Sequence, residues 1–352
     1  MRGAWLGAVT LMLLLGSAAH AASFDCSKAR TPFAKAICSN PELSKADEKL
    51  AATFKQTLEG LSPAAKTEVS SAQDKWVQYA NIACTDNAKP ATKPYNADAI
   101  SCLGDLFSGR TTELGNSKEI GGLRFYYIDR YATLKDTVSG ADETLAKVAT
   151  KEVSTPRIDG TDDEAQAFNG LIEAHAKDYL DPAAADHPTA DESGEDDSDA
   201  MIVDYVDPVR ISLNVNTYMY GHGAAHGNYA VAWAHYLRPQ KRFLTEADVF
   251  AAPDWKEKLQ AIALPAVKTQ MGDNLMLDDE GSINDLVVDP SRWDFNKNAL
   301  VLQFEPYEIA PYAAGAPTVS IPWSDLTALL APGAKDLAAG DPPPPSDDGS
   351  GQ

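Results

Sequence analysis

The sequence has no cysteine after residue 102, no long apolar run beyond its first residues and few basic side chains. Lysine and arginine number 30 against 51 aspartates and glutamates, which gives a formal net charge of −21 at pH 7. This shortage of basic groups argues against a nucleic-acid or anionic-membrane partner, because phosphate surfaces are bound through lysine and arginine. The acidity instead suits a basic protein partner, or simply keeps an exported protein soluble.

Motifs of common enzyme classes are also missing. The chain has no H-E-x-x-H zinc motif, no G-x-S-x-G nucleophile turn and no glycine-rich phosphate loop. His222 and His226 are four residues apart, but the glycine-rich stretch between them is not helical, so the spacing does not put both rings on one face. We therefore expect neither an enzyme nor a metal or cofactor site.

The first 21 residues have the pattern of a signal peptide. Arg2 is followed by an apolar run through Leu15 and by an A-x-A sequence at residues 19–21. The run is too short for a permanent membrane helix, and no later stretch qualifies as one. We expect cleavage after Ala21 and a mature protein that is soluble and either periplasmic or secreted.

Four cysteines, Cys26, Cys38, Cys84 and Cys102, lie in the first part of the chain. An even number in an exported segment indicates two disulfides. A zinc site is the alternative, but no C-x-x-C pair is present and the compartment is oxidising. Three pairings are open. We favour Cys26–Cys38 with Cys84–Cys102, because each closes a short local segment.

Residues 22–116 have a helical pattern. Asn-Pro at 40 and 41 and Ser-Pro at 62 and 63 are typical helix starts. Apolar residues then recur at three- and four-residue steps, as on one face of an amphipathic helix. Trp76 lies on such a face, so we expect it in the core. The pattern predicts a small helical bundle, which disulfides would help to stabilise.

The same region carries several short motifs, which are Ser23-Phe24-Asp25-Cys26, Ala36-Ile37-Cys38, Pro41-Glu42-Leu43 with Asp47, Gln73 with Trp76, Cys84, Cys102-Leu103, and Arg110 with Leu114. These residues resemble the LprI-type lysozyme-inhibitor family over 23–114. The resemblance implies the bundle fold and a protein that binds and inhibits lysozyme. Ala34, Ala80 and Asn81 stand where the family often has charged residues.

Residues 117–332 change to a strand-rich pattern after a stretch at 115–122 that looks like a linker. Apolar and polar residues alternate along 211–219 and 229–237, with a glycine-rich loop between, which predicts a β-hairpin. We also expect a strand at 125–134, a helix after residue 161, an acidic loop over 181–199, an inner strand at 299–304 and a last strand at 318–321. The whole is an α+β domain with an antiparallel sheet, followed by a disordered tail over 333–352.

This half also carries motifs, namely Tyr220-Gly221 through Ala225-His226-Gly227, Phe243-Leu244-Thr245 with Asp248-Val249-Phe250, and the run from Tyr307 to Gly315. They resemble the extracellular domain of the RsiV type, found in a lysozyme-sensing anti-sigma factor and beside some peptidoglycan deacetylases. The resemblance covers roughly residues 120–330. It implies lysozyme binding, whereas the signalling role has no counterpart, because this chain has no membrane helix or sigma-binding part.

These observations favour a protein that binds and inhibits lysozyme or a related peptidoglycan hydrolase in the cell envelope. The candidate contact residues are an aromatic, proline-stiffened loop and the hairpin turn, that is Tyr307, Glu308, Pro311, Tyr312, His222 and His226. The alternative for the loop is that its tyrosines close over the sheet edge. A peptidoglycan-binding module, with Tyr218, Tyr220 and Trp233 stacked on sugars, and an unrecognised hydrolase are the other two hypotheses.

Overall fold

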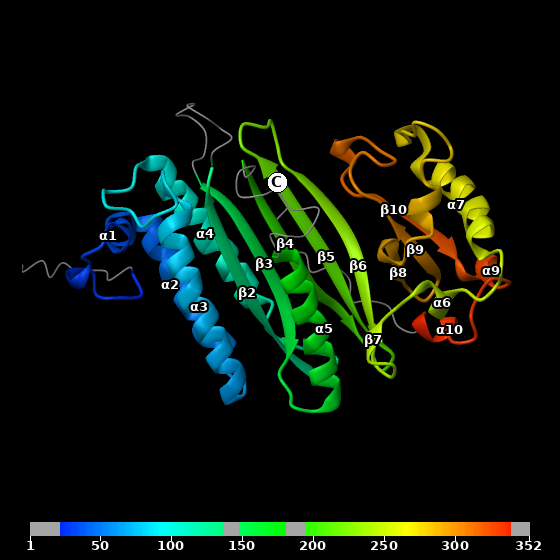
Figure 1. Cartoon of the computed structure of the whole chain (residues 1–352), viewed down its shortest axis with the longest axis horizontal. Coiled ribbons are helices and arrows are strands. Elements are labelled where there is room, and N and C mark those ends of the chain that lie inside the picture. Colours follow the sequence, from blue (N-terminus) through cyan, green and yellow to red (C-terminus); the bar gives the residue numbers. More distant parts are fainter. Residues whose placement is uncertain (1–21, 137–147, 181–193, 339–352) are drawn as a thin grey trace, which may run out of the picture.

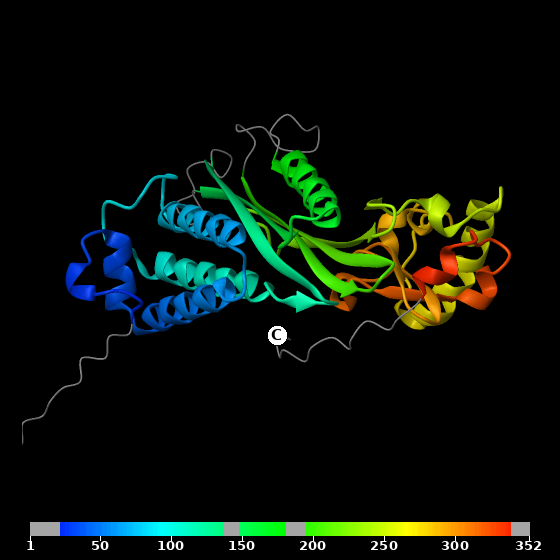
Figure 2. The same cartoon turned by 90° about the horizontal axis from the view of Figure 1, so that it is seen from below.

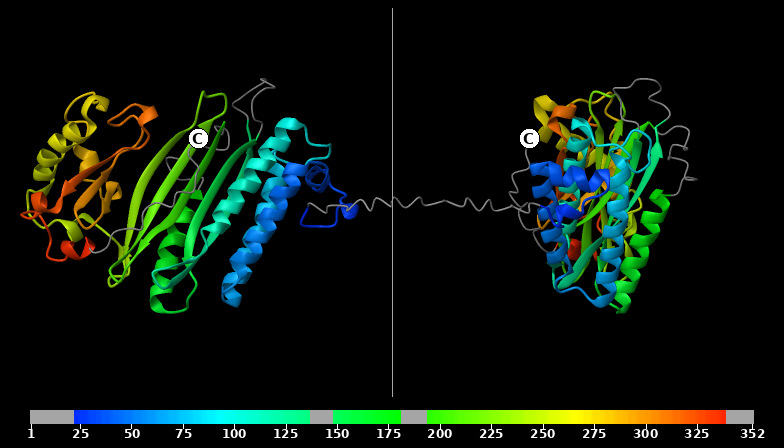
Figure 3. Two further views of the ribbon diagram at one scale, coloured as in Figure 1. Left: turned by 180° about the vertical axis from the view of Figure 1, so that it is seen from behind. Right: turned by 90° about the vertical axis from the view of Figure 1, so that its left-hand side faces the viewer.

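The computed structural model describes residues 22–136, 148–180 and 194–338. The expected signal peptide therefore lies outside the described residues. Figures 1 and 3 show a helical bundle at one end of the molecule, a large sheet in the middle and a smaller α+β unit at the other end. This is the predicted α+β class. Among the described residues, no helix combines the length and the apolar character needed to cross a membrane.

The bundle consists of four helices after a short 3-10 turn at Cys26–Lys28, and these are α1 (Pro32–Ser39), α2 (Pro41–Leu58), α3 (Pro63–Ala83) and α4 (Ala97–Gly115). Each helix starts at a polar cap whose side chain accepts backbone N–H groups. Asn40 caps α2 and Ser62 caps α3, each followed by proline at the first helical position. The helical bundle predicted from these signals is confirmed.

Two local disulfides each join neighbouring segments of the bundle. Cys26–Cys38 joins the 3-10 turn to α1 with a Cα–Cα distance of 5.7 Å, and Cys84–Cys102 joins the end of α3 to α4 at 5.8 Å. The favoured pairing is thus confirmed. Disulfides of this kind persist in oxidising compartments and stabilise a bundle whose core is small.

The central sheet has seven strands in sequential order, β1 (Glu119–Ile120), β2 (Leu123–Lys135), β3 (Val148–Ile158), β4 (Glu195–Val206), β5 (Arg210–Gly221), β6 (Asn228–Leu237) and β7 (Arg242–Phe243). All neighbours are antiparallel except β3 and β4, which are parallel and joined by α5 (Asp163–Leu180). Figure 2 shows α5 on one face of the sheet. There Phe168 and Ile172 pack with Leu213 in one buried cluster.

Two expectations about the connections were wrong. The supposed linker at 115–122 contains β1, which pairs with the start of β2. The supposed acidic loop ends before residue 195, because 195–199 belong to β4, and residues 181–193 lie outside the described ranges. The acidic side chains of β4 have charged or polar partners, and these contacts offset the entropy that the residues lose when they join the strand. Asp197 lies 3.5 Å from the ammonium of Lys151, and Asp199 lies 3.1 Å from the ring of His175.

The smaller unit contains a three-stranded sheet of order β10-β9-β8, formed by β8 (Trp293–Phe295), β9 (Ala299–Gln303) and β10 (Thr318–Pro322). β9 is the inner strand, as predicted. Around it lie α6 (Glu246–Val249), α7 (Trp255–Met271), α8 (Asn284–Val287), α9 (Trp323–Leu326) and α10 (Ala334–Leu337). The tail predicted from residue 333 therefore starts too early, because Ala334 and Leu337 are buried. Residues 339–352 are outside the description.

A buried ionic network joins the bundle to the sheet. Arg110 of α4 is 1% exposed, and its Nη1 contacts Asp129 of β2 and, at 3.1 Å, Glu113. Its Nε donates to Gln73 of α3 at 3.0 Å. Ser154 of β3 donates to Asp129 at 2.6 Å. Because one guanidinium holds groups from two helices and a strand, the bundle and sheet are fixed against each other.

Candidate functional site

The helical bundle contains a pocket of about 290 Å³. Five aromatic rings line it, four from the helices α1 to α4 and one from the segment before them, and these are Phe24, Phe33, Phe54, Trp76 and Phe107. Polar groups at the pocket are few, and Asp47 is one of them. We call this hollow the bundle pocket. An apolar hollow with a few placed polar groups is the usual form of a binding site.

Helical spacing brings the lining residues of the bundle pocket together. On α2, Asp47, Ala51 and Phe54 follow at steps of four and three, and on α3, Gln73 and Trp76 follow at a step of three. Trp76 is 3% exposed, as predicted for a core residue, and it also borders the hollow. The sequence interpretation missed this second aspect, since a core position and a pocket wall have the same apolar spacing.

A second candidate surface lies where the hairpin of β5 and β6 meets the segment between β9 and β10. We call it the aromatic patch, and it consists of Tyr218, His226, Tyr229, Tyr307 and Tyr312. The rings of His226 and Tyr312 stack with centroids 4.5 Å apart, and those of Tyr307 and Tyr312 are 5.4 Å apart. The Tyr312 hydroxyl donates to the carbonyl of Gly227 at 3.0 Å.

The outer members of the aromatic patch are open to solvent. Tyr307 is 58% and Tyr218 is 44% exposed. Tyr307 has a φ of +72°, a left-handed conformation that costs a tyrosine roughly 1 kcal/mol or more. The Tyr218 ring lies over Gly227, where an added Cβ would come within 2.2 Å of the tyrosine hydroxyl. Glycine at 227 is thus required for Tyr218 to sit in the patch.

The structure separates the six candidate contact residues into three groups. Tyr307, Tyr312 and His226 meet in the aromatic patch. Glu308 and Pro311 make contacts that hold the segment instead. Glu308 is paired with Arg292 at 3.0 Å and accepts from the Glu305 N–H at 2.6 Å, and the Pro311 carbonyl accepts the Ala314 N–H at 2.8 Å.

His222 lies apart from the other candidates. Its Nδ1 is 2.7 Å from Asp136 and its Nε2 is 3.4 Å from Asp196, with the imidazole fully buried. Tyr218 and Tyr229 were missed as members of the patch. The hairpin register, which pairs these two residues, is the signal that could have found them.

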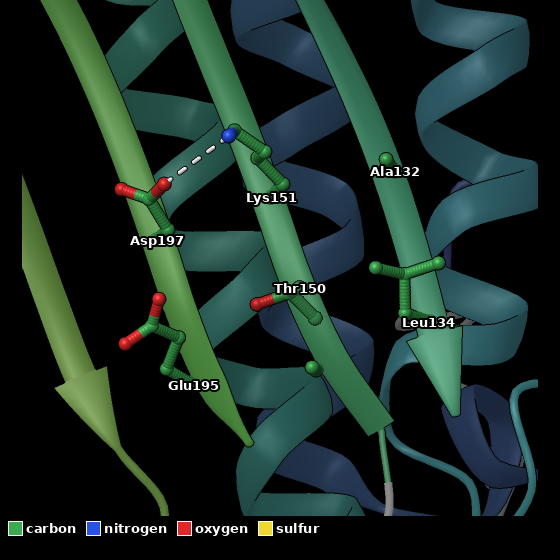
Figure 4. A pocket seen from close by; sticks show the side chains of 7 residues that line it. Ala132, Leu134, Thr150, Lys151, Glu195 and Asp197 are labelled. Atoms are coloured by element: carbon green, nitrogen blue, oxygen red, sulfur yellow. Dashed lines mark ion pairs between the residues drawn. The ribbon is translucent and has the colours of Figure 1, made fainter. Parts of the chain in front are cut away.

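Other polar clusters offer less to a ligand. Figure 4 shows a pocket at the ends of β2, β3 and β4, where Lys151 faces Asp197. Its volume of about 50 Å³ holds only a few water molecules. Ser212 lies 2.9 Å from His235, but both are buried. Burial and the Arg210 charge lower the pKa of His235 to about 3, far from that of a general base near neutrality. Within the described ranges, no three potential metal ligands gather.

Two family models match separate parts of the chain. Residues 26–114 match the family described as "Lysozyme inhibitor LprI", and residues 247–324 match "Protein of unknown function (DUF3298)". The first match confirms the resemblance found in the helical part. The second covers most of the smaller unit, including the 305–316 segment but not α10, and the finer resemblance to the RsiV type stays a prediction. None of the curated proteins matches the chain.

Two solved structures are similar to this chain. One is a DUF3298 family protein from Pseudomonas aeruginosa PAO1, with 19% identity and a TM-score of 0.44 over 62% of this chain and 98% of that one. The other is a DUF3298 family member from Bacteroides fragilis NCTC 9343, with 18% identity and a TM-score of 0.41 over 61% of this chain and 96% of that one. Neither likeness bears on function.

Proposed function

We propose that this protein binds and inhibits a lysozyme or a related peptidoglycan hydrolase in the periplasm or outside the cell. The observation that carries the proposal is the match of residues 26–114 to the lysozyme-inhibitor family, in a bundle with both disulfides formed. The net charge of −21 supports it, because lysozymes are commonly basic and opposite charges speed association.

Besides the helical bundle, we propose that the aromatic patch contacts the hydrolase. Tyrosines supply large contact areas with little loss of side-chain entropy, and they are frequent hot spots of protein interfaces. A strained, exposed tyrosine persists only where the surrounding structure holds it, which is common at binding sites. In the patch, stacking of Tyr312 on His226 and the bond from Tyr312 to Gly227 hold that surface in place.

The test is inhibition of wall lysis by the purified, oxidised protein. Chicken-type, goose-type and invertebrate-type lysozymes are assayed at low and near-physiological salt. We expect inhibition at nanomolar to micromolar concentration that survives the higher salt, because a specific site outlasts charge screening. No inhibition of any class at the higher salt would overturn the proposal. Binding to purified sacculi without a protein partner would then favour the peptidoglycan-binding alternative.

Replacing Tyr307 with glycine separates binding from folding. We expect inhibition to weaken by about tenfold, which corresponds to about 1.4 kcal/mol, because an exposed aromatic contact is lost. The unfolding free energy is expected to stay the same or rise by up to about 1 kcal/mol, since glycine relieves the strain at a φ of +72°. Lysis assays and urea unfolding measure the two effects.

Leu134→Ala is the control for the Tyr307 variant. Leu134 is also an exposed large apolar residue, at 40%, but it lies at the end of β2. We expect this variant to inhibit as well as the unchanged protein. Full inhibition by Tyr307→Gly would remove the aromatic patch from the proposed interface.

A further inference from the structure

We propose that the bundle pocket receives an arginine side chain of the partner protein. The inference rests on the proposed function for the identity of the partner, and it names the chemistry of the site that the partner fills. The pocket offers aromatic walls, one buried carboxylate and space for one side chain. Together these three features select a single, long, cationic guest.

The walls of the pocket suit a guanidinium. Phe33, Phe54 and Trp76 line it from three different helices. Phe33 and Trp76 are themselves fixed by Phe107, at centroid distances of 6.2 and 5.0 Å. A cation near an aromatic face is attracted by the negative ring face, most strongly for tryptophan, and arginine also stacks on such rings.

The carboxylate of Asp47 supplies the countercharge. Asp47 is 9% exposed, and its Oδ2 accepts the Ser23 N–H at 2.6 Å. Its Oδ1 has no hydrogen-bond partner in the described part of the chain. A largely buried carboxylate on the wall of an aromatic-lined pocket forms a strong, charge-assisted hydrogen bond with an incoming cationic donor.

No basic residue of the protein already fills this role. Lysine and arginine are absent from the described residues that line the pocket. Arg110 approaches the pocket from the sheet side, where its Nε donates to the lining residue Gln73 at 3.0 Å. Its guanidinium contacts Asp129 and, at 3.1 Å, Glu113, both on the side of the sheet. The Asp47 carboxylate therefore remains available to a guest.

The size of the pocket limits the guest. A volume of about 290 Å³ lies at the lower end of small-molecule sites, enough for one long side chain and too little for several linked sugar rings. Arginine is also enriched among interface hot spots, and a protein of net charge −21 attracts arginine-rich surfaces. An arginine of a basic lysozyme fulfils the volume, charge and aromatic requirements together.

A small probe tests the pocket without any lysozyme. Nα-acetyl-arginine amide is titrated into the full-length oxidised protein and followed by NMR shifts of the indole signals and by tryptophan fluorescence. We expect saturable millimolar binding. Asp47→Asn is expected to weaken it at least tenfold, while asparagine can still accept the Ser23 N–H. Asp74→Asn, the same charge change at an exposed position of α3, leaves it unchanged.

Either of two results with the arginine probe would overturn the inference, as would equal binding of an uncharged probe. One is the absence of binding, and the other is equal binding by the Asp47→Asn variant. Nα-acetyl-leucine amide tests the charge requirement, because binding as strong as that of the arginine probe would make the pocket merely apolar. Ala51→Met narrows the pocket from α2 and should abolish probe binding while the unfolding midpoint stays close to that of the unchanged protein.

Lysozyme assays of the same variants distinguish this inference from the proposed function. Inhibition weakened about tenfold in Asp47→Asn and Ala51→Met, but not in Asp74→Asn, supports both. Full inhibition by all variants would refute the pocket's role and leave the inhibitor proposal standing. Probe binding that depends on Asp47, in a protein that inhibits no lysozyme, would support a guanidinium pocket and refute the inhibitor proposal.

Discussion

Replacing Arg110 with leucine will lower the unfolding free energy by about 3–5 kcal/mol. The guanidinium is buried, and its loss leaves the Asp129 carboxylate, also buried, without its cation. Breaking one side of a buried ion pair costs this much because the remaining charge can neither reach water nor find another cation. Urea unfolding at pH 7, followed by circular dichroism, measures the change.

A surface arginine provides the control for the Arg110 variant. Arg124 is 37% exposed at its side chain and lies 3.8 Å from Glu119, so Arg124→Leu should cost no more than about 1 kcal/mol. Equal losses in the two variants would contradict a special role for the buried network. We further expect the unchanged protein to lose bundle and sheet signals in one transition, since Arg110 joins the two.

The bundle could be predicted from the sequence because its signals are local. Caps such as Asn40 with a following proline and apolar steps of three and four act within one or two turns, and the bonded cysteines are only 12 and 18 residues apart. The partner of Arg110 could not be predicted, because Asp129 lies in another element and only the fold brings it close. The motif residue Arg110 therefore has one partner inside the motif, Gln73, and its charged partner, Asp129, outside it.

Strands β3 and β4 were missed because their local composition argues against strands. Pro156 lies within β3, and β4 opens with Glu195, Asp196 and Asp197, a run that resembles a solvated loop. The structure accommodates these acids with cross-strand partners. Asp196 accepts the backbone N–H and the hydroxyl of Thr150 at 2.9 and 2.7 Å. Such long-range contacts override local propensity.

In the candidate sites, too, local motifs could be recognised from the sequence but long-range contacts could not. The tyrosines of the 305–316 segment were recognised from a motif, yet their meeting with His226 depends on how two loops pack. His222 and His226 belong to one turn, but the first is buried between aspartates and the second stacks on Tyr312. The spacing of four residues between the two histidines does not predict which of them is buried and which lies in the aromatic patch. Tertiary packing alone decides which residues of a glycine-rich turn face a partner.

The buried network also makes stability depend on pH through Glu113. Burial and the neighbouring Asp129 raise the pKa of Glu113 to about 8 from its ordinary 4.5, against the opposing effect of Arg110. One guanidinium cannot neutralise all the carboxyl groups around it, and its closest contact is Asp129. The folded state therefore binds a proton that the unfolded state releases. Its contribution is complete below about pH 4.5 and is lost as the pH rises to about 8.

Glu113→Gln removes this dependence, because glutamine resembles the protonated acid at every pH. Each pKa unit corresponds to about 1.36 kcal/mol, and the partial exposure of Glu113 reduces the effect below the full shift. We expect the unchanged protein to lose on the order of 2 kcal/mol relative to Glu113→Gln between pH 5 and pH 8. Urea unfolding at both pH values measures the difference.

Glu42→Gln is the matched control for the pH experiment, since Glu42 is exposed and pairs only with Lys45, at 2.8 Å, in the described residues. Its pH dependence should equal that of the unchanged protein. If Glu113→Gln also follows the unchanged protein, Glu113 is ionised in the folded state across this range. The single positive charge of Arg110 would then balance two carboxylates, and the destabilisation expected for Arg110→Leu would be larger, because both would lose their cation.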